Sequence, residues 1–328
     1  MATRGAATAA AAAALLLLLL PALASAQVIR VRQPFRTLMS APEYAKQRDL
    51  LILALQHLQQ MDADDPESFY QIGSIHGMPA APYAGVENVT SPYEPNSTRW
   101  LGYCDHAGVI FPTWHRPYVL QLELSIRRAA MRIAEQFEFQ FGLNVYKEAA
   151  ETLSWPYWDW AANEPHPAEL TDLTILVRVP PRMKWQRIAN PFYSYTFQKE
   201  TSSGASYTES QEIPFWSPAG SPTYRYPYVD NSTNTGYMSN QTGQIDTYNN
   251  MYNLTHDWVM NLFNINSWTC FADRGSQLST PFCPLQSLES VHNWVHLYIG
   301  GCELRGESVY VCVRVCACVR VCVHVMAA

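Results

Sequence analysis

Nine histidines are the side chains of this sequence best suited to chemistry, and five of them fall in spaced sets. His292 and His296 are four residues apart, so on a helix both imidazoles project from one face and can point at a single cation. His106 and His115 flank an aromatic-rich segment, and His76 lies thirty residues before His106. For the His292–His296 pair alone, ordinary packing competes with metal binding. Five neutral imidazole donors together favour a copper or zinc site.

The other four histidines show no such pattern. A lone histidine is usually a surface residue or a satisfied core residue, and we interpret His57, His166 and His256 in that way. His324 lies in a repetitive tail and receives no role.

Segments around the five spaced histidines resemble one known family. The run Gly102–Tyr118, which contains Phe-Pro-Thr-Trp-His-Arg-Pro, resembles the first copper signature of fungal-type tyrosinases, and Ile75–Gly77 resembles the upstream ligand segment. The aromatic run Trp155–Trp160 resembles the motif that follows, and Ser287–His296 resembles the start of the second copper site. The resemblance extends from about Ala41 to Gly301 and is weakest in its middle part.

This resemblance implies a mainly α fold, an antiparallel helical bundle around a dicopper site with long irregular loops. In tyrosinases two copper ions, each held by three histidines, bind O2 and convert monophenols and o-diphenols to o-quinones. By position, His76, His106 and His115 would hold the first copper, and His292 and His296 would hold the second. The implied partners are O2 and a small phenolic substrate.

The same resemblance suggests roles for three further residues. Cys104 matches the cysteine that relatives of this type join by a thioether to the second histidine, here His106; a buried free thiol is the alternative. Glu289 and Asn293 match the acid and amide that hold a water able to accept the phenol proton. For Glu289, a first-turn acid that stabilises the helix dipole is the alternative.

The sequence departs from the family pattern after Gly301. The third histidine of the second copper is expected in a segment like Asp-Pro-x-Phe-x-x-His-His, whereas residues 302–328 form a Val/Cys-rich tail. A thymine–guanine dinucleotide repeat read in frame encodes Val-Cys, so we interpret this tail as translated non-coding repeat rather than as a strand. We therefore expect an incomplete second copper site, a bundle incomplete at its C-terminus, and impaired phenol oxidation.

Four helices are predicted to position these residues. Apolar periodicity predicts helices over Ala41–Met61 and Pro117–Phe139, and a third over Leu285–Ile299. Asp65 is predicted to cap a short helix that runs to His76 and stops at Gly77. Residues 161–250 are rich in Tyr, Pro, Ser, Thr and Asn without sustained periodicity, which predicts loops with a few short strands.

The N-terminus predicts entry into the secretory route. Residues 1–26 combine Arg4, an apolar run and the small-residue step Ala24-Ser25-Ala26, as signal peptides do. A signal anchor is less favoured because the run is shorter than a membrane span and ends at Pro21. We expect a secreted protein without a membrane segment after cleavage, whose residues 27–301 form the copper-binding domain.

Two further patterns fit secretion. Cys270 and Cys283 can pair in a disulfide, as is common in secreted domains. Five Asn-x-Ser/Thr sequons offer glycosylation sites, at Asn88, Asn96, Asn231, Asn240 and Asn253.

Composition excludes other classes. A hydrophobic content of 48% can fill a core, which argues against disorder, and a net charge of -6 without a basic stripe argues against nucleic-acid binding. Competing functions are a catechol oxidase acting on diphenols only, a reversible O2 carrier, and a metal-free, inactive secreted glycoprotein. Neither the natural phenol nor the oligomeric state follows from the sequence.

Overall fold

The computed structural model describes residues 29–77, 79, 81–86, 102–104, 106–138, 144–162, 164–199, 201–203, 215–217, 219–220, 222–223, 227–229, 237–239, 241–274, 282–284, 286–300, 302–305 and 309–312. The predicted signal peptide lies outside these residues, as do the sequons at Asn88, Asn96, Asn231 and Asn240. The remaining sequon residue, Asn253, is exposed. Every helix and strand described below belongs to the unit Arg32–Ala328.

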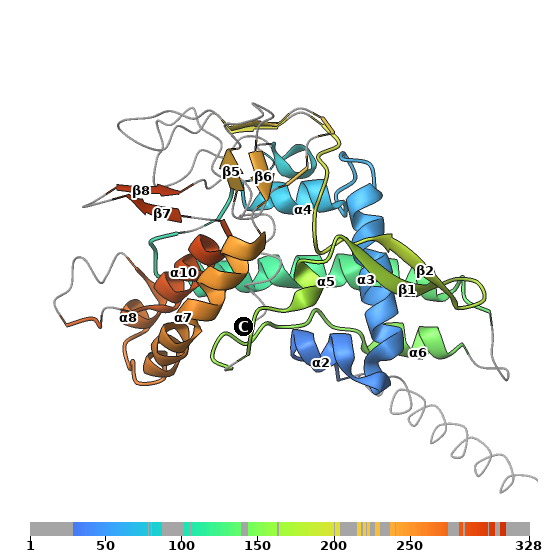
Figure 1. Ribbon diagram of the computed structural model, residues 1–328, viewed down its shortest axis with the longest axis horizontal. Helices are drawn as coiled ribbons and strands as arrows, with labels where there is room; N and C mark the ends of the chain where they lie inside the picture. Colours follow the sequence, from blue (N-terminus) through green and yellow to red (C-terminus); the bar gives the residue numbers. More distant parts are fainter. Residues whose placement is uncertain are drawn as a thin grey trace, which may run out of the picture. The chain divides into compact units, whose positions relative to one another are not determined.

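Helices form two packed groups (Figure 1). In one group α3 (Ala45–Gln60) packs against α5 (Phe111–Ala134) and α6 (Val145–Thr152), and in the other α7 (Gln241–Leu262) packs against α10 (Leu288–Gly300). The two groups meet where α10 contacts α5. The shorter helices are α2 (Phe35–Ser40), α4 (Phe69–Ile75) and α8 (Trp268–Ala272), with 3-10 turns η1 (Pro42–Tyr44), η2 (Tyr83–Gly85) and η3 (Ala168–Leu170).

Strands occur in the described residues as four antiparallel pairs. The pairs are β1 (Thr174–Val179) with β2 (Lys184–Ala189), β3 (Thr201–Ser203) with β4 (Phe215–Ser217), β5 (Pro227–Val229) with β6 (Tyr237–Ser239), and β7 (Cys302–Arg305) with β8 (Val309–Cys312). None of these pairs joins another into a larger sheet. The predicted mainly α fold is confirmed.

The central helix α3 is apolar on several sides, and other elements pack around it. Its residues from Leu50 to Leu55 are all buried, which is typical of a helix inside a core rather than on a surface. Asp49 is buried beside them, where its carboxylate accepts hydrogen bonds from Tyr146 Oη (2.8 Å) and Arg178 Nε (2.6 Å). This carboxylate thereby ties α3 to α6 and β1.

The predicted start of the helix before His76 was wrong. Asp65 does not cap it; its carboxylate accepts from the backbone N–H of Glu67, two residues on, in a local turn. The N-cap is Ser68, whose Oγ accepts from Gln71 N at 3.1 Å. The predicted end is confirmed, since His76 is the C-cap and Gly77 has a φ of 102°.

Helix α5 begins six residues before the predicted Pro117 and ends at Ala134 instead of Phe139. Its first backbone bond runs from Trp114 N to Ile110 O (2.8 Å), and Pro112 stands in the first turn, where its missing N–H costs nothing. Pro117 lies inside the helix and removes one bond without ending it. His115 is therefore a helix residue and not a loop residue.

Two other expectations need correction. The 22-residue helix α7 was not predicted, and it begins within the region we expected to be loops and short strands. At the start of the Val/Cys tail, which we expected not to be a strand, Val309–Cys312 forms β8 and pairs with Cys302–Arg305. The rest of the tail, residues 313–328, lies outside the described residues.

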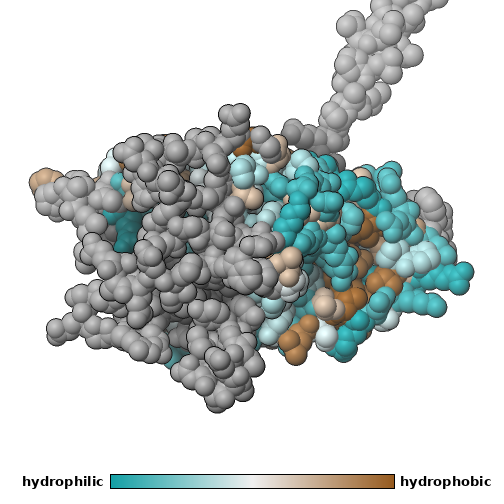
Figure 2. Space-filling view, turned by 90° about the horizontal axis from the view of Figure 1, so that it is seen from above, coloured by the Kyte–Doolittle hydropathy of each residue, from teal (hydrophilic) through white to brown (hydrophobic). Residues whose placement is uncertain are grey.

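The surface of the described residues is mostly polar in the view of Figure 2, with a smaller group of hydrophobic residues among them. Within the described part of the chain, we find no helix that is both long enough and apolar enough to span a bilayer.

Candidate metal centre

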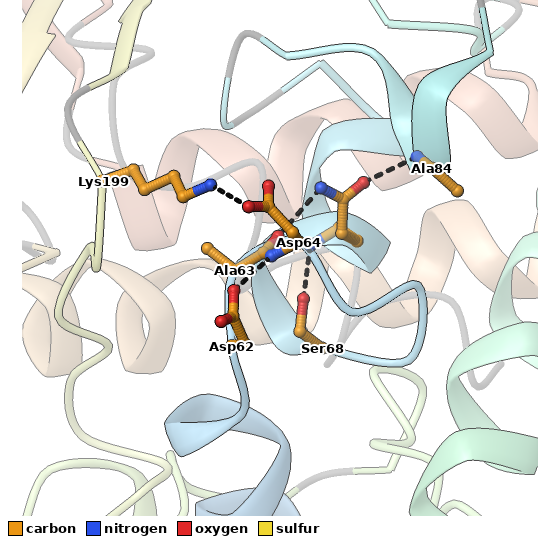
Figure 3. A network of polar contacts seen from close by, with 7 residues as sticks. Asp62, Ala63, Asp64, Ser68, Ala84 and Lys199 are labelled. Atoms are coloured by element: carbon orange, nitrogen blue, oxygen red, sulfur yellow. Dashed lines mark hydrogen bonds and ion pairs between the residues drawn. The ribbon is translucent and has the colours of Figure 1, made fainter.

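His76 is the C-cap of helix α4, and a network of polar contacts fixes this helix (Figure 3). The key side chain is Gln71, whose Nε2 donates to Ala63 O and whose Oε1 accepts from Ala84 N, both at 2.8 Å. Gln71 is buried, so both contacts replace bonds to water. At the edge of the network Lys199 pairs with Asp64. Gln71 thus holds α4 to the segments before and after it.

The loop that bears His106 lies directly against the residues after His76. Gly102 has a φ of +76°, and a Cβ placed on it would lie 2.4 Å from Gly77 N, closer than any side chain allows. Tyr103 N also donates to Ile75 O at 2.9 Å. The first two candidate ligands therefore approach each other because glycine occupies position 102.

The first three histidines form a compact group. Ring centroids lie 5.1 Å apart for His76 and His106, 5.2 Å for His106 and His115, and 5.2 Å for His76 and His115. The Nε2 atoms of His76 and His115 are 3.1 Å apart. On the other side of its ring, His115 Nδ1 donates to Phe111 O at 2.7 Å, which leaves the Nε2 lone pair of His115 facing His76.

The other two histidines project from one face of α10. Their ring centroids are 4.3 Å apart and the Nε2 atoms of His292 and His296 are 2.8 Å apart. His292 Nδ1 lies 3.1 Å from Asn293 Oδ1, an acceptor that places the ring proton on Nδ1. Trp294 packs against Trp258 in a tilted arrangement, with ring centroids 5.4 Å apart, and this contact joins α10 to α7.

The two groups of histidines share one site. The ring of His292 lies 6.2 Å from that of His106 and 5.9 Å from that of His115, and Phe111 contacts it edge-on at 4.9 Å. Tyr118 stacks on His76 at 5.6 Å. All five histidines selected from the sequence therefore converge, with aromatic side chains packed around them.

Burial keeps the rings of His76, His115 and His292 neutral. Desolvation, followed by the neighbouring imidazole of His106, lowers the pKa of His115 to about 3. Desolvation also holds the pKa of His76 and His292 well below the usual value, and the surrounding histidines lower it further. A neutral imidazole offers a lone pair to a metal ion without competition from a proton.

These donors fit copper. The site brings together uncharged nitrogen ligands, and Phe111 O and Asn293 orient two of the rings by hydrogen bonds, as outer partners of metal-bound histidines do. Nitrogens of separate residues that face each other at 2.8 and 3.1 Å leave lone pairs available to a shared cation. Imidazole donors also suit zinc.

Cys104 lies beside the first three histidines. Its Sγ and ring nitrogens of His76 and His106 all lie within 4.8 Å of one another. The thiol is half-buried, is not in a disulfide, and donates to His76 O at 3.7 Å. The thioether to His106 stays a prediction. The other predicted pairing is confirmed, since Cys270 and Cys283 form a disulfide.

Glu289 and Asn293 lie at the site in different ways. Glu289 is 1% exposed, and its two carboxylate oxygens accept from the backbone N–H groups of Ala107 (2.7 Å) and Arg274 (3.1 Å). Its burial raises its pKa, while these two amides act in the opposite direction. Asn293 contacts His292. Their predicted role in holding a water is not tested by these contacts.

The remaining described histidines have other surroundings. His57 and His256 are exposed, and His256 Nδ1 lies against Ala161 O. His166 is buried, where its ring nitrogens contact Pro167 O (3.0 Å) and Gln244 Nε2 (2.7 Å). His324 lies outside the described residues.

Sequence reasoning missed the residues that hold the ligand segments in place. Gln71 lies in no recognisable motif. Gly102 begins the Gly102–Tyr118 run, but nothing in the sequence marked its close approach to Gly77. Ser287 and Ser290 did carry a signal, because a Ser-x-x-Ser spacing before an apolar run is similar to a capping box.

Fold and site together define a mainly α protein with a histidine-lined metal centre, and comparisons with known proteins agree. The family model for the common central domain of tyrosinase matches residues 66–315. A tyrosinase from Neurospora crassa is 31% identical over 279 residues, which cover 83% of this chain and 39% of the relative. Polyphenol oxidase 4 from Agaricus bisporus is 31% identical over 263 residues, 80% of this chain and 39% of the relative.

A solved structure of recombinant mushroom tyrosinase has the same fold, with a TM-score of 0.70, 26% identity, and coverage of 91% of this chain and 50% of that chain. This chain belongs to the tyrosinase family. It spans about two fifths of the length of the two curated relatives.

Proposed function

We propose that this chain is the copper-binding part of a type 3 copper phenol oxidase that uses O2 to convert small monophenols and o-diphenols to o-quinones. The observation that supports this most strongly is the convergence of five imidazoles from α4, the following loop, α5 and α10 on one buried site. Membership of the tyrosinase family supports the same reaction class.

His76, His106 and His115 would hold the first copper, and His292 and His296 the second. When bound, the copper pair supplies the redox chemistry that couples O2 to phenol oxidation. The chain itself keeps three of the ligands, His76, His115 and His292, neutral by burial. It fixes the tautomers of His115 and His292 through Phe111 O and Asn293. Aromatic rings around the site, such as Phe111, exclude water from it.

The second copper site is proposed to be the weaker one. Of the nine histidines in the sequence, five converge, three lie elsewhere in the described residues, and His324 lies outside them. Two imidazoles match the second copper, whereas a catalytic copper or zinc site usually has three protein ligands. We expect this polypeptide to retain copper there poorly and to oxidise phenols slowly.

Secretion is also proposed. Residues 1–26 have the features of a signal peptide, and a disulfide such as Cys270–Cys283 forms mainly in oxidising compartments. N-terminal sequencing of the protein from the culture medium of a secreting host should begin at Gln27. Retention of the chain inside the cell would contradict this proposal.

The test of function is copper binding followed by turnover. Purified protein is loaded with copper, and metal content per chain is measured together with oxidation of a monophenol and an o-diphenol. We expect at least the first copper to bind and quinone to form slowly. The His115→Gln variant should lose both copper binding at the first site and quinone formation. His256→Gln, at an exposed position, is the matched control. A wild-type protein that binds no copper, or that binds O2 without oxidising any phenol, would refute the proposal.

Oxidation of diphenols only is the second candidate function. It is favoured by one observation: both oxygens of Glu289, which is predicted to help hold the water that accepts the phenol proton, already accept backbone hydrogen bonds. A protein that oxidises the o-diphenol and leaves the monophenol unchanged would support this candidate.

A further inference from the structure

Glu289 connects three segments of the site through one buried carboxylate. Oε1 accepts from Ala107 N, directly after His106, and Oε2 accepts from Arg274 N, shortly after α8. Glu289 itself lies on α10, three residues before His292. The carboxylate therefore contacts the loop of a first-site ligand while its own helix carries both second-site ligands.

The start of α10 does not need this carboxylate. Ser287 Oγ accepts from Ser290 N at 3.2 Å, and Ser290 Oγ accepts from Ser287 N at 2.6 Å, which is the reciprocal arrangement of a capping box. Because the two serines already cap the helix, and because the oxygens of Glu289 bond amides outside α10, stabilisation of the helix dipole does not explain where these oxygens point.

The loop after His106 does need a partner. Ala107 has a φ of 55°, a left-handed conformation that residues with a Cβ adopt reluctantly. Its N–H is the group that bonds Glu289, at 2.7 Å. A bond to a charged acceptor is stronger than one between neutral groups, so this contact can hold the unfavourable backbone in place.

We propose that Glu289 is a positioning residue that ties the His106 loop and the Arg274 segment to α10, and so fixes the spacing between the two copper-ligand groups. The expected consequence of this positioning, retention of copper, rests on the proposed function. The positioning role acts through the backbone and is distinct from holding a water for the phenol proton.

The direct test uses metal-free protein and amide hydrogen exchange at Ala107 and Arg274. In Glu289→Gln the side-chain NH2 must face one of these N–H groups, and in Glu289→Asp the carboxylate is one methylene too short to reach both. We expect exchange at one or both amides to become about ten-fold faster or more in each variant. If the glutamine variant does not fold, the aspartate variant gives the result.

Glu123→Gln is the matched control. Glu123 lies on α5, beyond the ligand loop. Its Oε2 also accepts from a backbone amide, Trp155 N at 3.1 Å, and from Arg32 Nε at 2.9 Å. Its replacement should leave exchange at Ala107 and Arg274 unchanged. Unchanged exchange at both amides in folded Glu289 variants would overturn the inference.

Copper affinity gives the second readout. Loss of an outer partner of a metal site typically weakens metal binding about 10–100-fold, and we expect this for the first copper in Glu289→Gln. A variant that keeps wild-type copper affinity and loses only monophenol turnover would overturn the positioning role in favour of the water-holding role. A wild-type chain that binds no copper would refute the proposed function and leave the exchange result standing.

Discussion

His76 and His115 face each other with their Nε2 atoms 3.1 Å apart, although they are 39 positions apart in the sequence. The contact follows from three features. Gln71 fixes the helix that ends at His76, glycine at position 102 lets the next loop approach, and Phe111 O holds the ring of His115 in one tautomer. Each of these supports can be tested separately from the ligands themselves.

The buried histidines should make the metal-free protein acid-sensitive. The pKa of His115 is lowered to about 3 in the folded protein, against about 6.5 in the unfolded chain. The unfolded chain therefore binds more protons below pH 6.5, and the free energy of unfolding falls as the pH falls from about 6.5 toward about 3, by up to about 1.4 kcal/mol per pH unit for this histidine.

Urea denaturation of the metal-free protein at about pH 7 and about pH 4.5 measures this effect. Replacement of His115 by Phe should reduce the dependence on pH, and replacement of the exposed His256 by Gln should not. Equal dependence in the wild type and the His115 variant would show that His115 is not buried as a neutral ring.

Gly102 should be intolerant of any side chain. Gly102→Ala introduces a Cβ 2.4 Å from Gly77 N at a φ of +76°, so we expect a loss of about 3 kcal/mol or more in unfolding free energy, together with loss of the first copper. Gly220 is the matched control, because its φ is +88° and a Cβ there meets nothing within 4 Å. Gly220→Ala should cost about 1–2 kcal/mol from the backbone alone.

Chemical denaturation of the two alanine variants separates the cost of the steric clash with Gly77 from the cost of a side chain at positive φ. Equal losses would mean that the close contact between the loop and the His76 segment contributes nothing.

The histidines could be selected from the sequence because metal ligands must recur at fixed spacings on helices and loops. His292 and His296 are such a pair, and the structure brings them to the other three. The helix ends were harder to predict. Asp65 and Ser68 are both good capping residues, so local preference does not choose between them. In the structure Ser68 caps the helix, and Gln71 Nε2 bonds Ala63 O, a contact that the sequence does not reveal.

Helix α7 escaped prediction for a related reason. Its sequence contains Gly243 and many Asn and Thr residues, which have low helix propensity, so local preference indicated loops. Packing against α10, including the contact of Trp258 with Trp294, supplies the stabilisation that local preference lacks. Tertiary contacts of this kind are not visible in a single sequence.

Gln71 should affect copper binding without touching the metal. Gln71→Leu keeps the approximate volume but leaves Ala63 O and Ala84 N without their buried partner, which should cost about 2–5 kcal/mol in unfolding free energy. Because α4 carries His76, affinity for the first copper should also fall. Lys199→Ala, at the exposed edge of the same network, should leave both properties unchanged.

Isothermal titration with copper and urea denaturation measure the two effects of the Gln71 variant. A variant that unfolds more easily but binds copper normally would show that α4 keeps its position without this side chain.

Cys104 should become linked to His106 only when the site holds copper in the presence of O2. Its Sγ and the ring nitrogens of His76 and His106 lie within 4.8 Å of one another, so a bond from sulfur to a ring carbon of His106 needs little movement. The bond forms with loss of two hydrogen atoms, for which bound copper together with O2 would supply the oxidant. We expect the proteolytic peptide that contains both residues to lose the mass of two hydrogens, and the thiol to stop reacting with alkylating reagents.

Two controls separate this reaction from ordinary thiol oxidation. Copper loading without O2 should leave Cys104 free to react, because no acceptor is present for the electrons. His106→Gln keeps the thiol but removes the ring, so its peptide should show no linked product. A Cys104 thiol that is still fully alkylated after copper and O2 treatment would show that the bond to His106 does not form.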